Sequence, residues 1–366
     1  MLKKYGFLVI AILVLVLSLA SCNLTDNSGR PGDPTEEYQF NDTMHWNIHG
    51  EEPHTIIDGV CSVCGYRASS DNTGDKEQDS SDLEFEVYDT YAVLTGLGTN
   101  TDVDLVIPDT YMGKPVTEIA DKAFPFKLRY PEFESITIPD SVVKIGEEAF
   151  YSCEKLKTIT MGSGVASIGS KAFWGLTNLT SIHVSEDNPY FQVISNVLFT
   201  KDGKTIVKYA GQKTDSEYIV PDGVQHIGDY AFHSCKNLTK VILPDGIKSI
   251  GVASFSWCDR LENLNLPEGL ETIADSAFGY TSISSFIFPD TLLSIGEDIF
   301  HYIQPLTSIH IGAALQSFPH VFINHEIHNN ITLTISEENE NFTIVDGVVY
   351  NKSDMSVVFD PNPDTN

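Results

Sequence analysis

The sequence predicts a right-handed repeat solenoid, α/β or mainly β, in which each coil adds one strand to a parallel sheet on the concave side. Three observations lead to this prediction. A phrase of 23 residues recurs from Leu83 onward. Its apolar residues alternate as they do in a half-buried strand. One copy has too few apolar residues to bury its own face, so neighbouring copies must stack into a continuous core.

The phrase reads L-x-x-I-x-I-P-D-x-V-x-x-I-G-x-x-A-F-x-x-C, and its copies are aligned by the second residue of the "IP" pair. That position is occupied by Pro108, Pro139, Gly162, Pro221, Pro244, Pro267, Pro289 and Gly312. The steps are 31, 23, 59, 23, 23, 22 and 23 residues, so one long insertion follows Gly162. Leu238, Val241 and Leu243 form a strand that Pro244 ends, because proline cannot donate the next hydrogen bond. A turn and a short helical or extended convex segment complete each coil. Stacked coils of this kind form a leucine-rich-repeat solenoid.

These linked positions resemble the BspA-type leucine-rich repeats of bacterial surface proteins. The resemblance covers the predicted solenoid, residues 83–361, and residues 87–124 look like the usual first repeat of that family. It implies adhesion or host-protein binding and no catalytic residues. We therefore expect no enzyme activity and no cofactor for the solenoid.

The insertion is duplicated near the C-terminus. Residues 185–209 match residues 336–359, and the paired positions are 151 residues apart, as in Asn188 and Asn339 or Phe191 and Phe342. Each copy predicts an inserted β-hairpin, over 185–216 and 336–360, with "KDGK" at 201–204 as a turn. The second hairpin is a candidate C-terminal cap for the solenoid. Residues 362–366 are expected to be a disordered tail.

The N-terminus predicts export. Two lysines precede an apolar run that ends in "LASC" at Cys22, and this pattern is typical of a secretory signal over residues 1–21. The ending resembles the bacterial lipobox, which implies lipidation of Cys22; an ordinary signal peptide is the alternative. We expect an extracytoplasmic protein, lipid-anchored to the bacterial cell envelope and surface-exposed.

A small Cys/His module, residues 45–68, lies between a flexible tether at 22–44 and an acidic linker at 69–82. Cys61 and Cys64 form a C-x-x-C pair, with His45, His49 and His54 upstream. Two thiolates and two histidines would suit a tetrahedral structural zinc site within residues 45–64. A disulfide between the two cysteines and a pair of free thiols are the alternatives.

The outward positions of the strands form two mostly uncharged columns that predict a binding face. Its candidate residues are Thr137, Thr160, His183, Lys240, Ile242, Asn263, Asn265, Ile287 and His310. The alternative is that Thr, Ser and Asn simply suit a half-exposed sheet. That alternative explains His183, Ile242, Ile287 and His310 least well.

Two further columns have simpler interpretations. An acidic residue follows most of the "IP" pairs, as in Asp140 and Asp290. A row of carboxylates suits calcium, whereas single carboxylates accept backbone hydrogen bonds in the following turn. Cys153, Cys235 and Cys258 share one slot that other coils fill with Leu176, Thr281 and Ile303. This slot is therefore interpreted as core, where cysteine acts as a small hydrophobe.

Charge narrows the class of partner. The formal net charge of −29 repels phosphate backbones and anionic lipid surfaces, so nucleic-acid binding is excluded and membrane contact is expected only through the lipid. We expect a cell-surface lipoprotein that binds a host or neighbouring-cell protein through the solenoid. A glycan-binding module and an envelope structural protein without a ligand are the alternatives. The sequence sets no oligomeric state.

Overall fold

The structure is a computed structural model, and it describes residues 82–124, 132–212, 214–303, 305–317 and 331–359. Toward the N-terminus it also gives the backbone of β1 (Met44–Asn47), β2 (Gly50–Pro53), β3 (Ile56–Ile57) and β4 (Val60–Cys61), which form two antiparallel pairs. The chain divides into the units Met1–Glu77 and Gln78–Asn366. The predicted signal peptide, Cys22 and the C-terminal tail lie outside the described residues.

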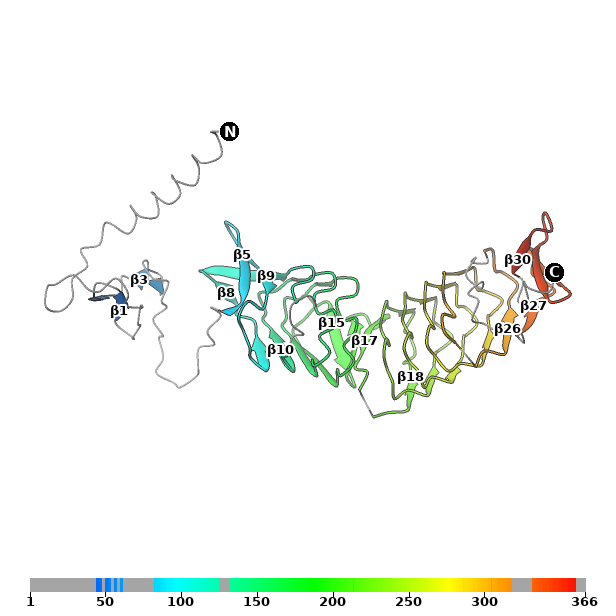
Figure 1. The fold of residues 1–366 in the computed structure, drawn as a ribbon, viewed down its shortest axis with the longest axis horizontal. Coiled ribbons are helices and arrows are strands. Elements are labelled where there is room, and N and C mark those ends of the chain that lie inside the picture. The colour runs from blue at the N-terminus through cyan, green and yellow to red at the C-terminus, as the bar shows by residue number, and fades with distance from the viewer. Residues whose placement is uncertain are drawn as a thin grey trace, which may run out of the picture. The chain divides into compact units, whose positions relative to one another are not determined.

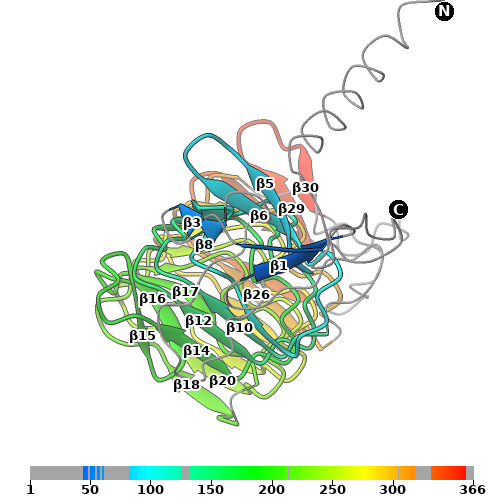
Figure 2. The same ribbon diagram turned by 90° about the vertical axis from the view of Figure 1, so that its left-hand side faces the viewer.

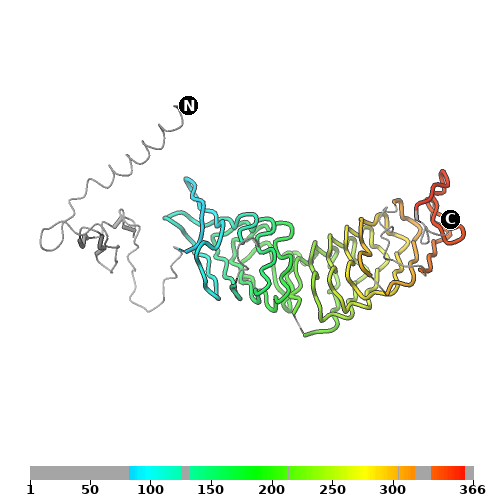
Figure 3. Tube along the Cα trace, viewed as in Figure 1, coloured from blue at the N-terminus to red at the C-terminus, as the bar shows by residue number. Residues whose placement is uncertain are grey.

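The second unit is a β-solenoid, as predicted. Its coils contribute ten main strands: β7 (Asp104–Val106), β10 (Ser135–Ile138), β12 (Thr158–Met161), β14 (Ser181–Val184), β18 (Glu217–Ile219), β20 (Lys240–Ile242), β22 (Asn263–Leu264), β24 (Ser285–Ile287), β26 (Ser308–Ile311) and β27 (Thr332–Ile335). They pair in parallel as three sheets, β7-β10-β12-β14, β18-β20-β22 and β24-β26-β27. Figures 1 and 3 show the coils following one another along the chain. We call the surface made by their outward side chains the strand face.

A second, shorter ladder runs through the other side of the coils. It is divided between two sheets: β9 (Lys114–Ile119), β11 (Lys144–Ile145) and β13 (Ser167–Ile168) pair in the first, and β19 (His226–Ile227), β21 (Ser249–Ile250), β23 (Thr272–Ile273) and β25 (Ser294–Ile295) pair in the second. In the part of the chain that the structure describes there is no α-helix, so the convex segments are extended and turned rather than helical. Left-handed residues cause this: Glu148 and Ser152, with φ of 54° and 57°, flank the buried Phe150 and interrupt any helix.

The first coil is closed by an antiparallel hairpin. It pairs β5 (Glu84–Val87) with β6 (Ala92–Gly96), and β6 then pairs in parallel with β9. A short strand, β8 (Thr110–Tyr111), pairs with the start of β9. This hairpin covers the N-terminal end of the short ladder, which is the role of a capping repeat in a solenoid.

Stacked side chains fill the core. The rings of Phe232 and Phe255 lie 4.9 Å apart, and those of Phe255 and Phe278 lie 6.1 Å apart. Each buried phenylalanine contributes about 1.5–3 kcal/mol. The three cysteines of the repeat, Cys153, Cys235 and Cys258, are buried and form no disulfide. The other residues in the same position of the repeat are buried too: Leu176, Thr281 and Ile303. Burial raises the pKa of the Cys153 thiol. The interpretation of this slot as core is confirmed.

The two insertions each form three strands, one more than a hairpin. The first meander, residues 185–209, contains β15 (Phe191–Ile194), β16 (Val197–Thr200) and β17 (Thr205–Tyr209); the second meander, residues 336–359, contains β28 (Phe342–Val345), β29 (Val348–Asn351) and β30 (Val357–Phe359). The tight turns have both central residues left-handed, at Ser195–Asn196 and Asp346–Gly347, as a type I′ turn requires. "KDGK" instead connects β16 to β17. Figure 2 shows β15–β17 beside the main strands.

Candidate functional site

The strand register places the predicted face residues in line. Thr137 pairs with Thr160, and Thr160 pairs with His183. Further along, Lys240 pairs with Asn263. Ile287 pairs with His310 in the last sheet. Because these positions alternate with buried residues, their side chains emerge together on the strand face.

Several polar side chains of this face bond to one another. His183 Nε2 lies 2.9 Å from Ser181 Oγ, and His310 Nδ1 lies 2.8 Å from Thr334 Oγ1. Lys240 Nζ lies 3.4 Å from the carboxylate of Glu217 on the preceding coil. Exposed pairs of this kind contribute little stability, but they fix the positions of neighbouring side chains. The polar face is thus an ordered surface.

Asn265 belongs to the sheet itself. Its side-chain amide donates to the carbonyl of Leu243 at 2.9 Å, and its side-chain oxygen accepts from the Leu243 N–H at 2.8 Å. These bonds stand in for main-chain pairing, because β22 ends at Leu264. The repeat step that follows is 22 residues instead of 23, and β22 and β24 belong to different sheets. Asn265 therefore supports the sheet, and its role in binding stays a prediction.

Three isoleucines on the strand face have no such explanation. Ile219 is 66% exposed and Ile287 is 69% exposed, and the half-buried Ile242 pairs directly with Ile219. We call these three residues the isoleucine patch; Ile219 and Ile242 are neighbours, and Ile287 lies two coils beyond Ile242, with Asn265 in the coil between them. Ile219 is not among the residues predicted from the sequence, because its strand follows the long insertion. The signal was present, since "YIVP" at 218–221 repeats "VILP" at 241–244.

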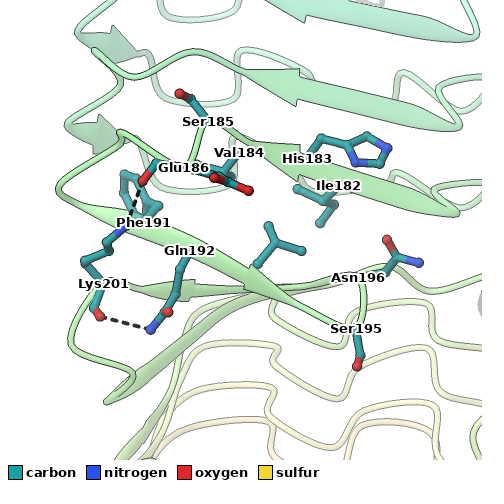
Figure 4. A pocket seen from close by; sticks show the side chains of 11 residues that line it. Ile182, His183, Val184, Ser185, Glu186, Phe191, Gln192, Ser195, Asn196 and Lys201 are labelled. Atoms are coloured by element: carbon teal, nitrogen blue, oxygen red, sulfur yellow. Dashed lines mark hydrogen bonds between the residues drawn. The ribbon is translucent and has the colours of Figure 1, made fainter.

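A cavity of about 550 Å³ opens beside β14 (Figure 4). β14 is the last strand of its sheet, and the first meander forms the other wall. His183, Gln192 and Asn196 bring polar side chains to the lining. Gln192 Nε2 donates to the carbonyl of Lys201 at 2.9 Å, which holds the meander wall together. These groups donate and accept hydrogen bonds, so the cavity suits recognition of a polar group.

Single carboxylates of the acidic row accept hydrogen bonds from the next coil. Asp140 Oδ1 accepts from the N–H of Ser163 at 2.5 Å and from its hydroxyl at 2.9 Å, and Asp290 Oδ1 accepts from the N–H of Ala313 at 2.9 Å. The backbone bond and then the hydroxyl bond lower the pKa of Asp140. This matches the hydrogen-bonding interpretation, except that the donors lie one coil on instead of in the following turn.

The predicted metal module is described only as backbone. His45 lies in β1 and Cys61 in β4, and His49, His54 and Cys64 lie outside the described residues. Among the side chains that the structure describes, no group of three or more His, Cys, Asp or Glu residues is placed to hold a metal ion. Zinc and a disulfide both stay predictions for this module. Within the described ranges no helix is long and apolar enough to span a membrane.

A parallel strand in every coil, a stacked phenylalanine core and an ordered strand face together define a leucine-rich-repeat β-solenoid. The model of the family described as "BspA type Leucine rich repeat region" matches in six copies over residues 117–207 and 204–334. The chain belongs to this family, whose members are typically cell-surface proteins. No curated protein matches the sequence.

Solved structures resemble the solenoid. The crystal structure of the pneumococcal vaccine antigen PcpA is 28% identical, with a TM-score of 0.51, over 63% of this chain and 60% of that one. The present chain therefore spans about 60% of that structure. A leucine-rich cell surface protein from Faecalibacterium prausnitzii is 22% identical, with a TM-score of 0.43, over 71% and 95% of the two chains. A leucine-rich repeat protein from Bacteroides ovatus is 24% identical, with a TM-score of 0.41, over 70% and 66%.

Proposed function

We propose that this chain is a non-catalytic recognition protein that binds an extracellular or host protein through its strand face. The isoleucine patch is the observation that carries the proposal. Polar neighbours on the same face are bonded to one another or to the backbone, whereas Ile219 and Ile287 expose most of their apolar surface. Apolar anchors surrounded by polar groups are typical of the centre of a protein interface.

The proposed location agrees with this role. The N-terminal signal and a lipid on Cys22 would hold the protein at the outside of the cell, with residues 22–44 and 69–82 as tethers. A pneumococcal protein that shares the fold is described as a vaccine antigen, and a useful antigen is reachable from outside the cell. A surface-held solenoid can meet a partner on another cell.

The patch is tested by direct binding. We would immobilise purified serum and extracellular-matrix proteins and measure binding of the full chain. The variant Ile219→Ser/Ile242→Ser/Ile287→Ser removes the patch, and the matched control Val103→Ser/Met112→Ser/Val357→Ser removes three exposed apolar residues elsewhere. We expect saturable binding of the wild type and the control, and at least tenfold weaker binding of the patch variant. Equal binding by all three proteins would refute a role for the patch.

The glycan-binding alternative has less support on this face. At the outward positions of the described main strands no phenyl, phenol or indole ring occurs, and such rings are the usual platforms for sugars. The strand face therefore favours a protein partner over a glycan.

A further inference from the structure

The turn after the buried phenylalanine carries an aromatic ring in every described copy. Two adjacent positions share this role, and in five copies one is aromatic while the other is small. The pairs are Tyr151 and Ser152, Trp174 and Gly175, His233 and Ser234, Ser256 and Trp257, Gly279 and Tyr280, with His301 and Tyr302 both aromatic. The ring thus moves from the first position to the second between His233 and Trp257.

The change of position exposes two of the three later rings. In the first position, His233 is only 7% exposed, and its Nε2 accepts a hydrogen bond from Trp174 Nε1 at 3.0 Å. In the second position, Trp257 is 46% exposed and Tyr302 is 43% exposed. Tyr151 and Trp174 in the earlier coils and Tyr280 in the later ones are half-buried, so Trp257 and Tyr302 are the rings that the second position exposes most.

The second position does not need a ring. Its backbone is left-handed in each of these coils, with φ of 57° at Ser152, 78° at Gly175 and 62° at Ser234. Glycine and small polar residues adopt this conformation most readily, and it is uncommon for bulky residues. Nevertheless Trp257 and Tyr280 adopt it, with φ of 63° and 60°. The fold would accept serine or glycine here at lower cost.

The rings stack along the solenoid. Those of Trp257 and Tyr280 lie 4.0 Å apart at 14°, and those of Tyr280 and Tyr302 lie 4.8 Å apart at 26°. We call these three residues the aromatic ladder. The stabilisation from stacking and the cost of a left-handed aromatic residue are of similar size. Folding stability thus gives no net reason to place three large rings here, two of them exposed.

We propose that the aromatic ladder is a binding site for a neutral polysaccharide. Trp257 is the end of the ladder, because the same position one coil earlier holds Ser234, which has no ring. The apolar C–H face of a sugar would stack on the indole of Trp257. Asp259 and Arg260 follow in the next turn and are exposed; they would bind the sugar hydroxyls. This site lies on the turns, apart from the strand face, and goes beyond the proposed protein recognition.

Charge selects the class of glycan. The net charge of −29 repels sulfated and carboxylated polysaccharides. A neutral chain avoids this repulsion, and its alternating apolar and hydroxylated surfaces match a ring flanked by polar side chains. The ladder therefore fits uncharged plant or microbial polysaccharides.

The test uses a substitution that the repeat itself supplies. Trp257→Ser introduces serine, which is the residue at the equivalent position one coil earlier, Ser234. The full chain, wild type and variant, is incubated with cellulose, xylan, mannan and starch, and retention and indole fluorescence are measured. We expect the wild type to bind at least one of them and Trp257→Ser to bind it at least tenfold more weakly. Tyr190→Ser, which removes a ring that is 50% exposed in the first meander, should bind as the wild type does.

Thermal unfolding confirms that both variants are folded, and Tyr302→Ser repeats the test at the other end of the ladder. The isoleucine-patch variant should keep its affinity for the polysaccharide, which separates this site from the strand face. Retention of none of the four polysaccharides by the wild type would overturn the proposal. Undiminished binding by Trp257→Ser and Tyr302→Ser would overturn it too.

Discussion

The two meanders share a sequence pattern but occupy different places in the solenoid. The first lies between coils, and its last strand, β17, pairs in parallel with β19 of the next coil. In the second, β30 pairs only with β29 among the described strands. The same unit therefore serves as a joint in one place and closes the described part of the solenoid in the other. Comparing them shows which features belong to the unit and which belong to the joint.

A buried asparagine belongs to the unit. Asn188 donates from Nδ2 to the carbonyls of Gly162 and Val165, both at 3.0 Å, and its Oδ1 accepts from the N–H groups of Tyr190 and Phe191, both at 2.8 Å. The carboxamide joins the start of the meander to the coil before it.

Asn339 repeats this arrangement. Its Nδ2 donates to the carbonyl of Gly312 at 2.8 Å, and its Oδ1 accepts from the N–H groups of Asn341 and Phe342 at 2.9 and 2.8 Å. Both asparagines are almost wholly buried. A buried amide that satisfies several backbone groups specifies one arrangement of the chain.

Substitution of these asparagines should have the largest effect. Asn188→Ala leaves two carbonyls and two N–H groups without their partner, so we expect a loss of roughly 3 kcal/mol in unfolding free energy. Asn339→Ala should cost as much locally. Native-state hydrogen exchange should show it as opening of the second meander alone, with the coils before it unaffected. Global unfolding by Asn339→Ala would contradict the assignment of the second meander as a cap.

Glycine replaces proline in the coil before each meander. A Cβ on Gly162 would lie 2.6 Å from the backbone of Asp140, and one on Gly312 would lie 2.2 Å from the carbonyl oxygen of Pro289. Gly162→Ala and Gly312→Ala should therefore each destabilise by about 2 kcal/mol, because backbone must move. Gly246→Ala is the control, since its nearest neighbour would lie 3.4 Å away. Chemical denaturation would measure all three, and equal effects would rule out the close approach as the cause.

Acid should weaken the joint through His233, in the coil that follows the first meander. Burial, and then the nearby Lys208, lower the pKa of His233 to about 3. In the unfolded chain it titrates near 6.5. The unfolded state binds the proton first, so stability is complete above pH 6.5 and falls as the pH drops toward 3. We expect a loss of roughly 2 kcal/mol between pH 6.5 and about pH 5.

This acid effect belongs to one residue, so His233→Gln should remove most of the pH dependence in that range. Protonation of Nε2 would break the bond from Trp174 that spans the joint. Thermal unfolding of both proteins at several pH values measures the difference. The same slope in wild type and variant would show that other groups are responsible.

The smallest effect concerns Lys208, which differs between the two meanders. Its ammonium is fully buried and donates to the carbonyl of Tyr230 at 3.1 Å, and the position 151 residues on is Phe359. Burial lowers the pKa of Lys208. Lys208→Met should stabilise the protein by about 1 kcal/mol, because a buried cation is costly. Calorimetry would detect it, and a destabilised variant would mean that the lysine holds the joint together.

The sequence predicted much of this architecture because apolar period and strand pairing are local properties. The 23-residue step, the duplicated insertion and the buried position of Cys153 all follow from which residues recur. The sequence predicts two strands for each meander, because it makes "KDGK" the turn of a hairpin, whereas in the first meander this turn leads into a third strand. The bonds of Asn265 and the aromatic ladder depend on contacts between coils. The aromatic residue shifts by one position in the repeat between His233 and Trp257, and this shift changes how exposed the ring is although each of the two coils still carries one ring at this turn.

We propose that a protein partner binds the strand face at the isoleucine patch. Amide hydrogen exchange of the full chain, alone and saturated with a bound protein from the binding panel, tests it most directly. We predict new protection at residues 217–219, 240–242 and 285–287, with little change in the turns that carry the aromatic ladder. Protection confined to those turns or to the meanders, with the three main-strand segments unchanged, would contradict binding at the isoleucine patch.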